Sequence, residues 1–118
     1  MAKGDDIQER LINFAVNIIE FTGKLPNSSA GKHIANQLMR SGTSSAPNYA
    51  EARSAESTKD FIHKLKVALK ELNETKVWLQ IIERSKMLLN VEFKELCKEC
   101  DELCRIMNAS VKTAMKSL

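Results

Sequence analysis

An all-α fold, an up-and-down antiparallel four-helix bundle, is predicted by three features of the sequence. Apolar residues recur at alternating spacings of three and four along four long segments, which is the periodicity of amphipathic helices. The 118 residues include only 4 Gly and 2 Pro, too few for the many tight turns of a β-sandwich or barrel. A composition of 43% hydrophobic and 28% charged residues fits one soluble domain over residues 1–118 and excludes an intrinsically disordered chain.

The first helix is expected over residues 5–22. Its apolar stripe consists of Ile7, Leu11, Phe14, Ile18 and Phe21. Asp5 and Asp6 place negative charge at the helix start, and Gly23 followed by Pro26 ends it. Residues 23–28 are therefore expected to be a linker.

The second helix is expected over residues 29–54, and its middle is ambiguous. Ser28 or Ser29 can cap its first turn. The serine-rich segment before Pro47 resembles a loop, and a proline within a helix costs about 3 kcal/mol if nothing compensates for the lost hydrogen bond. Alternatively, small side chains let one long helix pack closely on a neighbour. The residues by themselves favour neither alternative.

Two further helices are expected over residues 58–85 and 91–116. Ser57 begins a capping-box-like start, after which heptad spacing continues without interruption from Phe61 to Ile82. Asn90 can cap the last helix, whose apolar face begins at Phe93. Four such helices joined by short links are typical of an up-and-down bundle.

Charge is unevenly distributed along the chain. The formal net charge is +3, but residues 24–70 alone carry eight basic and three acidic residues, or +5. The N-terminal segment MAKGDDIQER lacks the apolar core of a signal peptide, and no apolar run approaches the roughly 18 residues that would span a membrane. We therefore expect a cytoplasmic protein with reduced thiols and no membrane role.

A row of basic residues is predicted on the third helix. Lys59, His63, Lys66 and Lys70 follow a 4-3-4 spacing, about 160° away from the apolar stripe. Such a row is either an ordinary solvated face or a track that binds phosphates. With one Trp and one Tyr, the chain has no platform for stacking single-stranded bases. The candidate nucleic-acid-binding residues are Arg40, Arg53, Lys59, His63, Lys66 and Lys70.

No catalytic residues, cofactor or metal site is predicted. Cys97, Cys100 and Cys104 share one helical face, but they interleave with core residues and have no fourth ligand nearby, which favours buried structural thiols over a metal or redox site. The E-x-x-H pairs of a di-metal bundle are missing. A second apolar stripe of Val67, Trp78 and Ile81 either widens the core or forms a subunit interface, where Trp is enriched.

The central residues resemble the 23S rRNA-intervening sequence protein family of bacteria. The resemblance runs through the segments Arg40-Ser41-Gly42-Thr43-Ser44, Asn48-Tyr49, Ala55-Glu56-Ser57, Asp60-Phe61-Ile62, Ala68-Leu69-Lys70-Glu71 and Trp78-Leu79. It implies a four-helix bundle, a continuous second helix bent at Pro47, and a homopentamer like the nucleic-acid-binding accessory protein of diversity-generating retroelements. Pro47 departs from the pattern, since members usually have a small residue there. The resemblance carries no catalytic residues.

The sequence and the resemblance together lead to one expected function and one alternative. We expect a non-enzymatic oligomer that binds nucleic acid, in particular structured RNA or an RNA–protein complex, through a basic surface. The alternative is a protein–protein adaptor whose lysines serve solubility and whose apolar stripe holds a protein partner.

Overall fold

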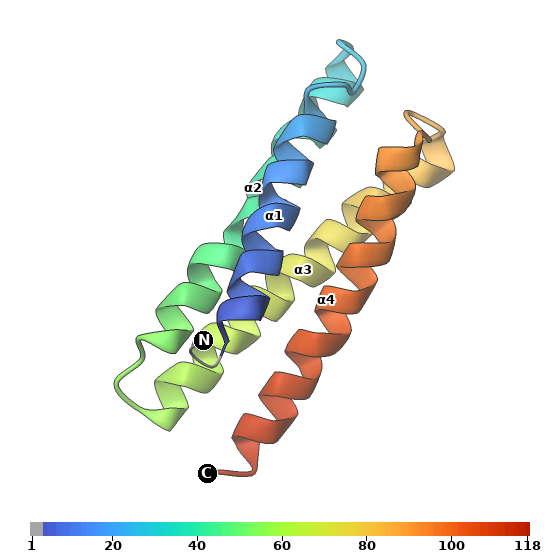
Figure 1. Ribbon diagram of the computed structural model, residues 1–118. Helices are drawn as coiled ribbons and strands as arrows, with labels where there is room; N and C mark the ends of the chain where they lie inside the picture. Colours follow the sequence, from blue (N-terminus) through green and yellow to red (C-terminus); the bar gives the residue numbers. More distant parts are fainter. Residues whose placement is uncertain (1–3) are drawn as a thin grey trace.

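The computed structural model describes residues 4–118 and confirms the four-helix bundle. The helices are α1 (Asp5–Thr22), α2 (Ser29–Arg53), α3 (Thr58–Ser85) and α4 (Val91–Met115), arranged up and down in chain order (Figure 1). Their ends lie within one residue of those that the apolar periodicity predicts. Each helix packs on the next along the chain, and α1 and α4 close the bundle with the least extensive contact.

Three of the four helices begin with a side-chain cap. Ser28, Ser57 and Asn90 accept hydrogen bonds from the backbone N–H groups three residues later, at 3.0, 3.1 and 2.8 Å. Each cap satisfies one of the amides that a first helical turn leaves without a partner. The short loops at residues 23–28 and 86–90 lie at one end of the bundle (Figure 1), and the loop between α2 and α3 lies at the other.

Helix α2 continues without a break through Pro47, as the resemblance implies. Small residues allow this helix to approach its neighbours closely: a Cβ atom on Gly42 would lie 2.9 Å from side-chain carbons of Ile18 on α1. The Asn48 amide donates to the Ser44 carbonyl at 2.9 Å, close to the hydrogen bond that proline removes. The small residues of α2 thus allow close packing on α1 along the continuous path through Pro47.

The core is built from the predicted apolar stripes. Leu11, Leu38, Leu65, Leu72 and Leu103 are fully buried. Within residues 4–118, no helix is long and apolar enough to cross a membrane.

Candidate nucleic-acid interface

The predicted basic row lies on the outer surface of α3. Lys59, His63, Lys66 and Lys70 are all exposed on one unbroken helix, and the row is about 16 Å long. None of these four side chains forms an ion pair with any residue between 4 and 118. The charges of Lys59, Lys66 and Lys70 are therefore available to an external anion, and His63 adds a hydrogen-bonding side chain to the row.

Helix α4 adds cations beside this row, which sequence reasoning missed. Lys76 of α3 and Asp101 of α4 form a 3.1 Å ion pair, which shows that these two residues lie at the same level of the antiparallel helices. Arg105 and Lys112 follow Asp101 by four and eleven residues, so they lie on the same side of α4 and level with the N-terminal half of α3. Lys116, at the C-cap of α4, continues the line, and all three side chains are exposed.

We call the combined surface the α3/α4 basic face. It consists of Lys59, His63, Lys66, Lys70, Arg105, Lys112 and Lys116. The α4 cations were not singled out from the sequence because residues 71–118 carry eight charged residues of each sign, although Arg105, Lys112 and Lys116 all follow the last carboxylate, Glu102. Helical spacing separates the two signs: Glu95, Glu99 and Glu102 point toward α1, and the cations flank α3.

Arg40 and Arg53, the two arginines predicted to contact nucleic acid, both have carboxylate partners. The Arg40 guanidinium on α2 lies 3.2 Å from the carboxylate of Glu71 and also pairs with Glu74. Arg53 binds Asp5 at 2.6 Å and the side-chain oxygen of Gln8 at 2.8 Å. The structure therefore separates these two residues from the unpaired cations of α3.

The second apolar stripe is divided between the α2/α3 contact and the surface. Trp78 is half-buried, meets His33 edge to face at a centroid distance of 5.9 Å, and donates to Glu74 at 3.1 Å. Val67 is also half-buried, whereas Ile81 is 39% exposed next to Val77, which is 51% exposed. Trp78 thus supports the packing of α2 on α3, and Ile81 is open to a partner.

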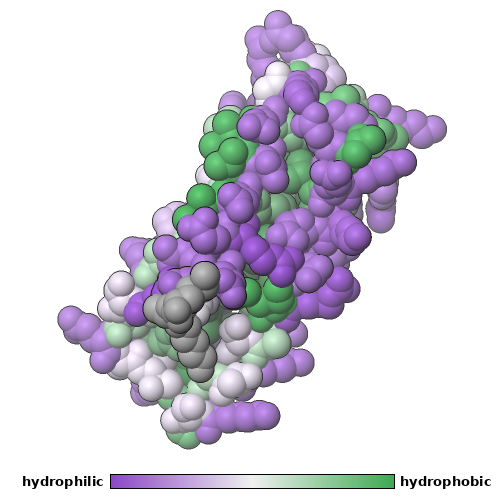
Figure 2. Space-filling view, in the orientation of Figure 1, coloured by the Kyte–Doolittle hydropathy of each residue, from purple (hydrophilic) through white to green (hydrophobic). Residues whose placement is uncertain are grey.

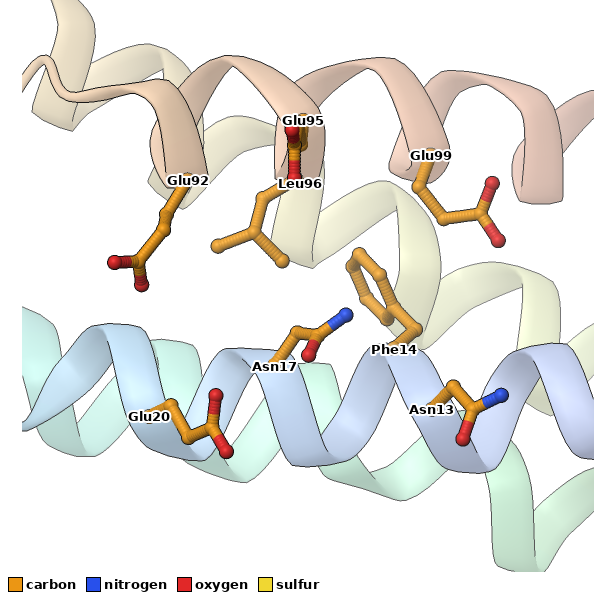
Figure 3. A pocket seen from close by; sticks show the side chains of 8 residues that line it. All are labelled: Asn13, Phe14, Asn17, Glu20, Glu92, Glu95, Leu96 and Glu99. Atoms are coloured by element: carbon orange, nitrogen blue, oxygen red, sulfur yellow. The ribbon is translucent and has the colours of Figure 1, made fainter.

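A groove of about 320 Å³ between α1 and α4 carries the opposite charge (Figure 3). Phe14 and Leu96 form its floor, and its remaining lining residues are Asn13, Asn17, Glu20, Glu92, Glu95 and Glu99. Glu99 is paired with Arg10 at 2.6 Å, and Glu92 with Lys24. In Figure 2, a hydrophobic strip lies between hydrophilic side chains of these two helices. A polyanion would be repelled here, which leaves the α3/α4 basic face as the favourable side.

The part of the chain that the structure describes offers no metal centre. No group of three or more His, Cys, Asp or Glu side chains in residues 4–118 is arranged to hold a metal ion. Cys97, Cys100 and Cys104 are free thiols that face α3, and Cys100 is fully buried.

Fold and surface together define a small four-helix-bundle protein whose charges are segregated by face. The chain belongs to the 23S rRNA-intervening sequence protein family, whose model matches residues 5–109. It is also similar to a crystal structure described as a protein with unknown function from the S23 ribosomal protein family of Bacteroides thetaiotaomicron VPI-5482. The two share 32% sequence identity with a TM-score of 0.83, over 90% of this chain and 98% of that one. No curated protein is significantly similar in sequence. Neither the family nor this neighbour indicates an enzymatic activity.

Proposed function

We propose that the protein is a non-enzymatic, self-associating bundle that binds structured RNA, alone or in an RNA–protein complex, through the α3/α4 basic face. The observation that carries this proposal is the set of exposed basic residues on two adjacent helices, none of which forms an ion pair with any residue between 4 and 118. A solvated helix face usually alternates charges of both signs, whereas this surface gathers one sign.

The physical basis of binding is neutralisation of phosphates. Each Lys or Arg that contacts a phosphate releases condensed counterions, so affinity depends steeply on salt and only weakly on base sequence. Two parallel rows of cations on neighbouring helices suit a double-stranded backbone better than a flexible single strand. Aromatic residues make up only 5% of the chain, so base stacking is expected to contribute little.

Arg40 and Arg53 have a secondary role in this proposal. To contact a phosphate, the guanidinium of Arg40 or of Arg53 has to break its ion pair with a carboxylate of the same chain. Replacing a carboxylate partner with a phosphate yields little net free energy of binding. We therefore assign the main contacts to the α3/α4 basic face.

Self-association would strengthen the binding. The exposed Val77 and Ile81 continue the outer side of α3 beyond the basic row, and Ile81 belongs to the predicted subunit interface with Val67 and Trp78. Five subunits, the number that the family resemblance implies, would bring five charges of +3 together, or about +15.

The test compares two double variants with the same change in charge. Lys66→Gln/Lys70→Gln removes two cations from the basic face, and the control Lys32→Gln/Lys86→Gln removes two exposed, unpaired lysines at the opposite end of the bundle. Binding of a structured RNA is measured by fluorescence anisotropy between 0.05 and 0.3 M salt. At about 0.1 M salt, each phosphate contact is worth roughly eightfold in affinity.

The basic-face variant should therefore bind tens of times more weakly, with a salt slope smaller by nearly 2, and the control should change little. Salt-independent binding, or an equal loss in both variants, would refute the proposal. The oligomeric state is measured separately by analytical ultracentrifugation, with Ile81→Asp expected to shift it toward monomer.

A second candidate function, a protein adaptor, is favoured by one observation on α1. Ile12, Val16 and Ile19 lie on one side of this helix and are 39%, 47% and 50% exposed. Exposed apolar stripes of this kind are typical of protein contacts. If this is the main function, Val16→Asp should abolish recovery of one stoichiometric protein partner after nuclease treatment and leave any RNA binding unchanged.

A further inference from the structure

A second groove lies at the end of the bundle where α1 begins and α4 ends. Arg10 of α1 pairs with Glu99 and Glu102 of the antiparallel helix α4. The start of α1, five residues before Arg10, is therefore near the level of Ile106 on α4. Helix α4 continues past this level (Figure 1), so its last turns extend beyond α1. The groove, of about 840 Å³, lies between this part of α4, the start of α3 and the end of α2.

The floor of this groove is apolar and elongated. Phe61 and Leu65 of α3 and Ile106 and Ala109 of α4 contribute carbon surface to its lining. Leu65 is fully buried, and Phe61 and Ile106 are half-buried. Along α4 the lining extends from Ile106 to Ser117, a length of about 16 Å. A groove of this volume with an apolar floor is typical of sites for small organic ligands, and its length suits an extended chain.

Tyr49 of α2 places a buried hydroxyl in the groove. Tyr49 is only 8% exposed and lines the groove, yet its hydroxyl forms no hydrogen bond with any residue between 4 and 118. Burial raises the pKa of Tyr49, so the hydroxyl keeps its proton at neutral pH and can donate. Because a buried hydroxyl without a partner costs free energy, an acceptor supplied by a ligand would stabilise this site.

Arg53 supplies a second donor beside the Tyr49 hydroxyl. Two nitrogens of its guanidinium donate to Gln8 and Asp5 of α1, whereas its Nε–H has no hydrogen-bond partner in the described part of the chain. A Cβ atom on Gly4 would lie 2.9 Å from the Tyr49 hydroxyl oxygen and 3.1 Å from Arg53 Nε. The two donors thus flank one point at Gly4, close enough together to bind the two oxygens of one carboxylate.

The charges around the groove favour an anion. Arg53 is the one charged residue among the described residues that line it. Lys59 and Lys116 follow and precede the lining residues Thr58 and Ser117 in the chain, are exposed, and form no ion pair within residues 4–118. Even with Arg53 paired to a carboxylate, these two lysines keep the rim positive, so a negatively charged ligand is attracted.

We propose that this groove binds a small amphipathic anion, namely a single-chain carboxylate of the fatty-acid type. Its hydrocarbon chain lies along Phe61 and Ile106, and its carboxylate accepts hydrogen bonds from the Tyr49 hydroxyl and Arg53 Nε–H. None of the seven residues of the α3/α4 basic face lines the groove. The inference therefore goes beyond the proposed function and does not depend on RNA binding.

The experiment titrates the full chain with decanoate in a calorimeter, below the concentration at which decanoate forms micelles. Decanoate should bind with saturation at one molecule per chain, and more tightly than the uncharged decanol. Tyr49→Phe removes only the hydroxyl, so it should weaken decanoate binding roughly tenfold and leave decanol binding unchanged. Absence of saturable binding would overturn the proposal, and equal affinities for decanoate and decanol would refute the anionic head group.

A pair of tryptophan variants tests the location of the site. Ala109 is exposed and lines the groove, so Ala109→Trp should fill the groove without disturbing the core and should weaken decanoate binding more than tenfold. Ala30→Trp, at an exposed position at the opposite end of the bundle, is the control and should bind normally. Circular dichroism verifies that both variants are folded.

Two results of this comparison would contradict the proposal. Equal decanoate binding by the two tryptophan variants would place the ligand elsewhere, for example on the exposed apolar stripe of α1. If decanoate does not bind and Ala109→Trp alone lowers the oligomeric state in analytical ultracentrifugation, the groove is a contact between copies of the chain and not a ligand site.

Discussion

Replacing Ser45 with alanine is expected to stabilise the protein, whereas the same replacement at Ser41 should destabilise it. Both serines are fully buried in α2, one turn apart. The hydroxyls of Ser41 and Thr75 lie 2.9 Å apart, and Thr75 also donates to the Glu71 carbonyl at 2.8 Å. The Ser45 hydroxyl has no hydrogen-bond partner among residues 4–118. The two substitutions are thus chemically identical but differ in what they remove.

The magnitudes follow from these contacts. Alanine gains about 0.5 kcal/mol of helix propensity over serine at either position. Ser45→Ala also removes a buried, unpaired hydroxyl, which costs about 1–3 kcal/mol in the folded state, so we expect a net stabilisation of at least about 1.5 kcal/mol. Ser41→Ala loses a hydrogen bond worth about 1 kcal/mol and leaves the Thr75 oxygen with one partner fewer, so we expect a net loss of about 0.5–1 kcal/mol.

The assay is thermal unfolding followed by circular dichroism at one fixed protein concentration, because self-association would make the midpoint depend on concentration. For a chain of 118 residues, 1 kcal/mol corresponds to about 4 °C in Tm. The Tm values of the two variants should therefore differ by at least about 8 °C, with the Tm of the unaltered protein between them. Equal destabilisation by both substitutions would show that the Ser45 hydroxyl is satisfied in solution and that the reasoning is wrong.

Three further predictions concern a loop contact, an ion pair and a titration. A methyl group on Gly31 would overlap the Pro26 carbonyl oxygen, so Gly31→Ala should cost more than about 2 kcal/mol in chemical denaturation. The control is Gly23→Ala, where φ is helical and a Cβ atom would make only ordinary van der Waals contacts, so this substitution should be neutral or slightly stabilising. Arg10→Met should lose no more than about 1 kcal/mol of stability, since the side chains of its two ion pairs with α4 are between 32% and 47% exposed, and the loss should shrink in 1 M salt. A loss of stability that does not depend on salt would contradict this prediction. Burial raises the pKa of Tyr49, the single tyrosine, so phenolate absorbance at 295 nm should show a midpoint above 10 in the folded protein. Tyr49 ionises at a lower pH in the unfolded chain than in the folded protein. Its contribution to the free energy of unfolding is therefore complete below pH 10 and decreases as the pH rises further. Tyr49→Phe should remove this decrease.

Secondary structure was predictable because its signals are local. Apolar spacing placed all four helices, and the caps at Ser28, Ser57 and Asn90 fixed three of their starts. Such signals depend only on residues within one turn of each other. The path of α2 through Pro47 was not determined in this way. Whether a proline breaks a helix depends on what packs against it, here Gly42 on Ile18 of another helix.

The residues of the candidate site were likewise predictable from the sequence only in part. The sequence by itself determined that Lys59, His63, Lys66 and Lys70 share one side of a helix, since a single helical period relates them. Only the tertiary structure decided that Arg40 and Arg53 meet carboxylates and that cations of α4 extend the basic row. Ion pairs between helices depend on the register in which the helices pack. That register is set by the burial of side chains distant in sequence, so no local pattern of charges can specify it.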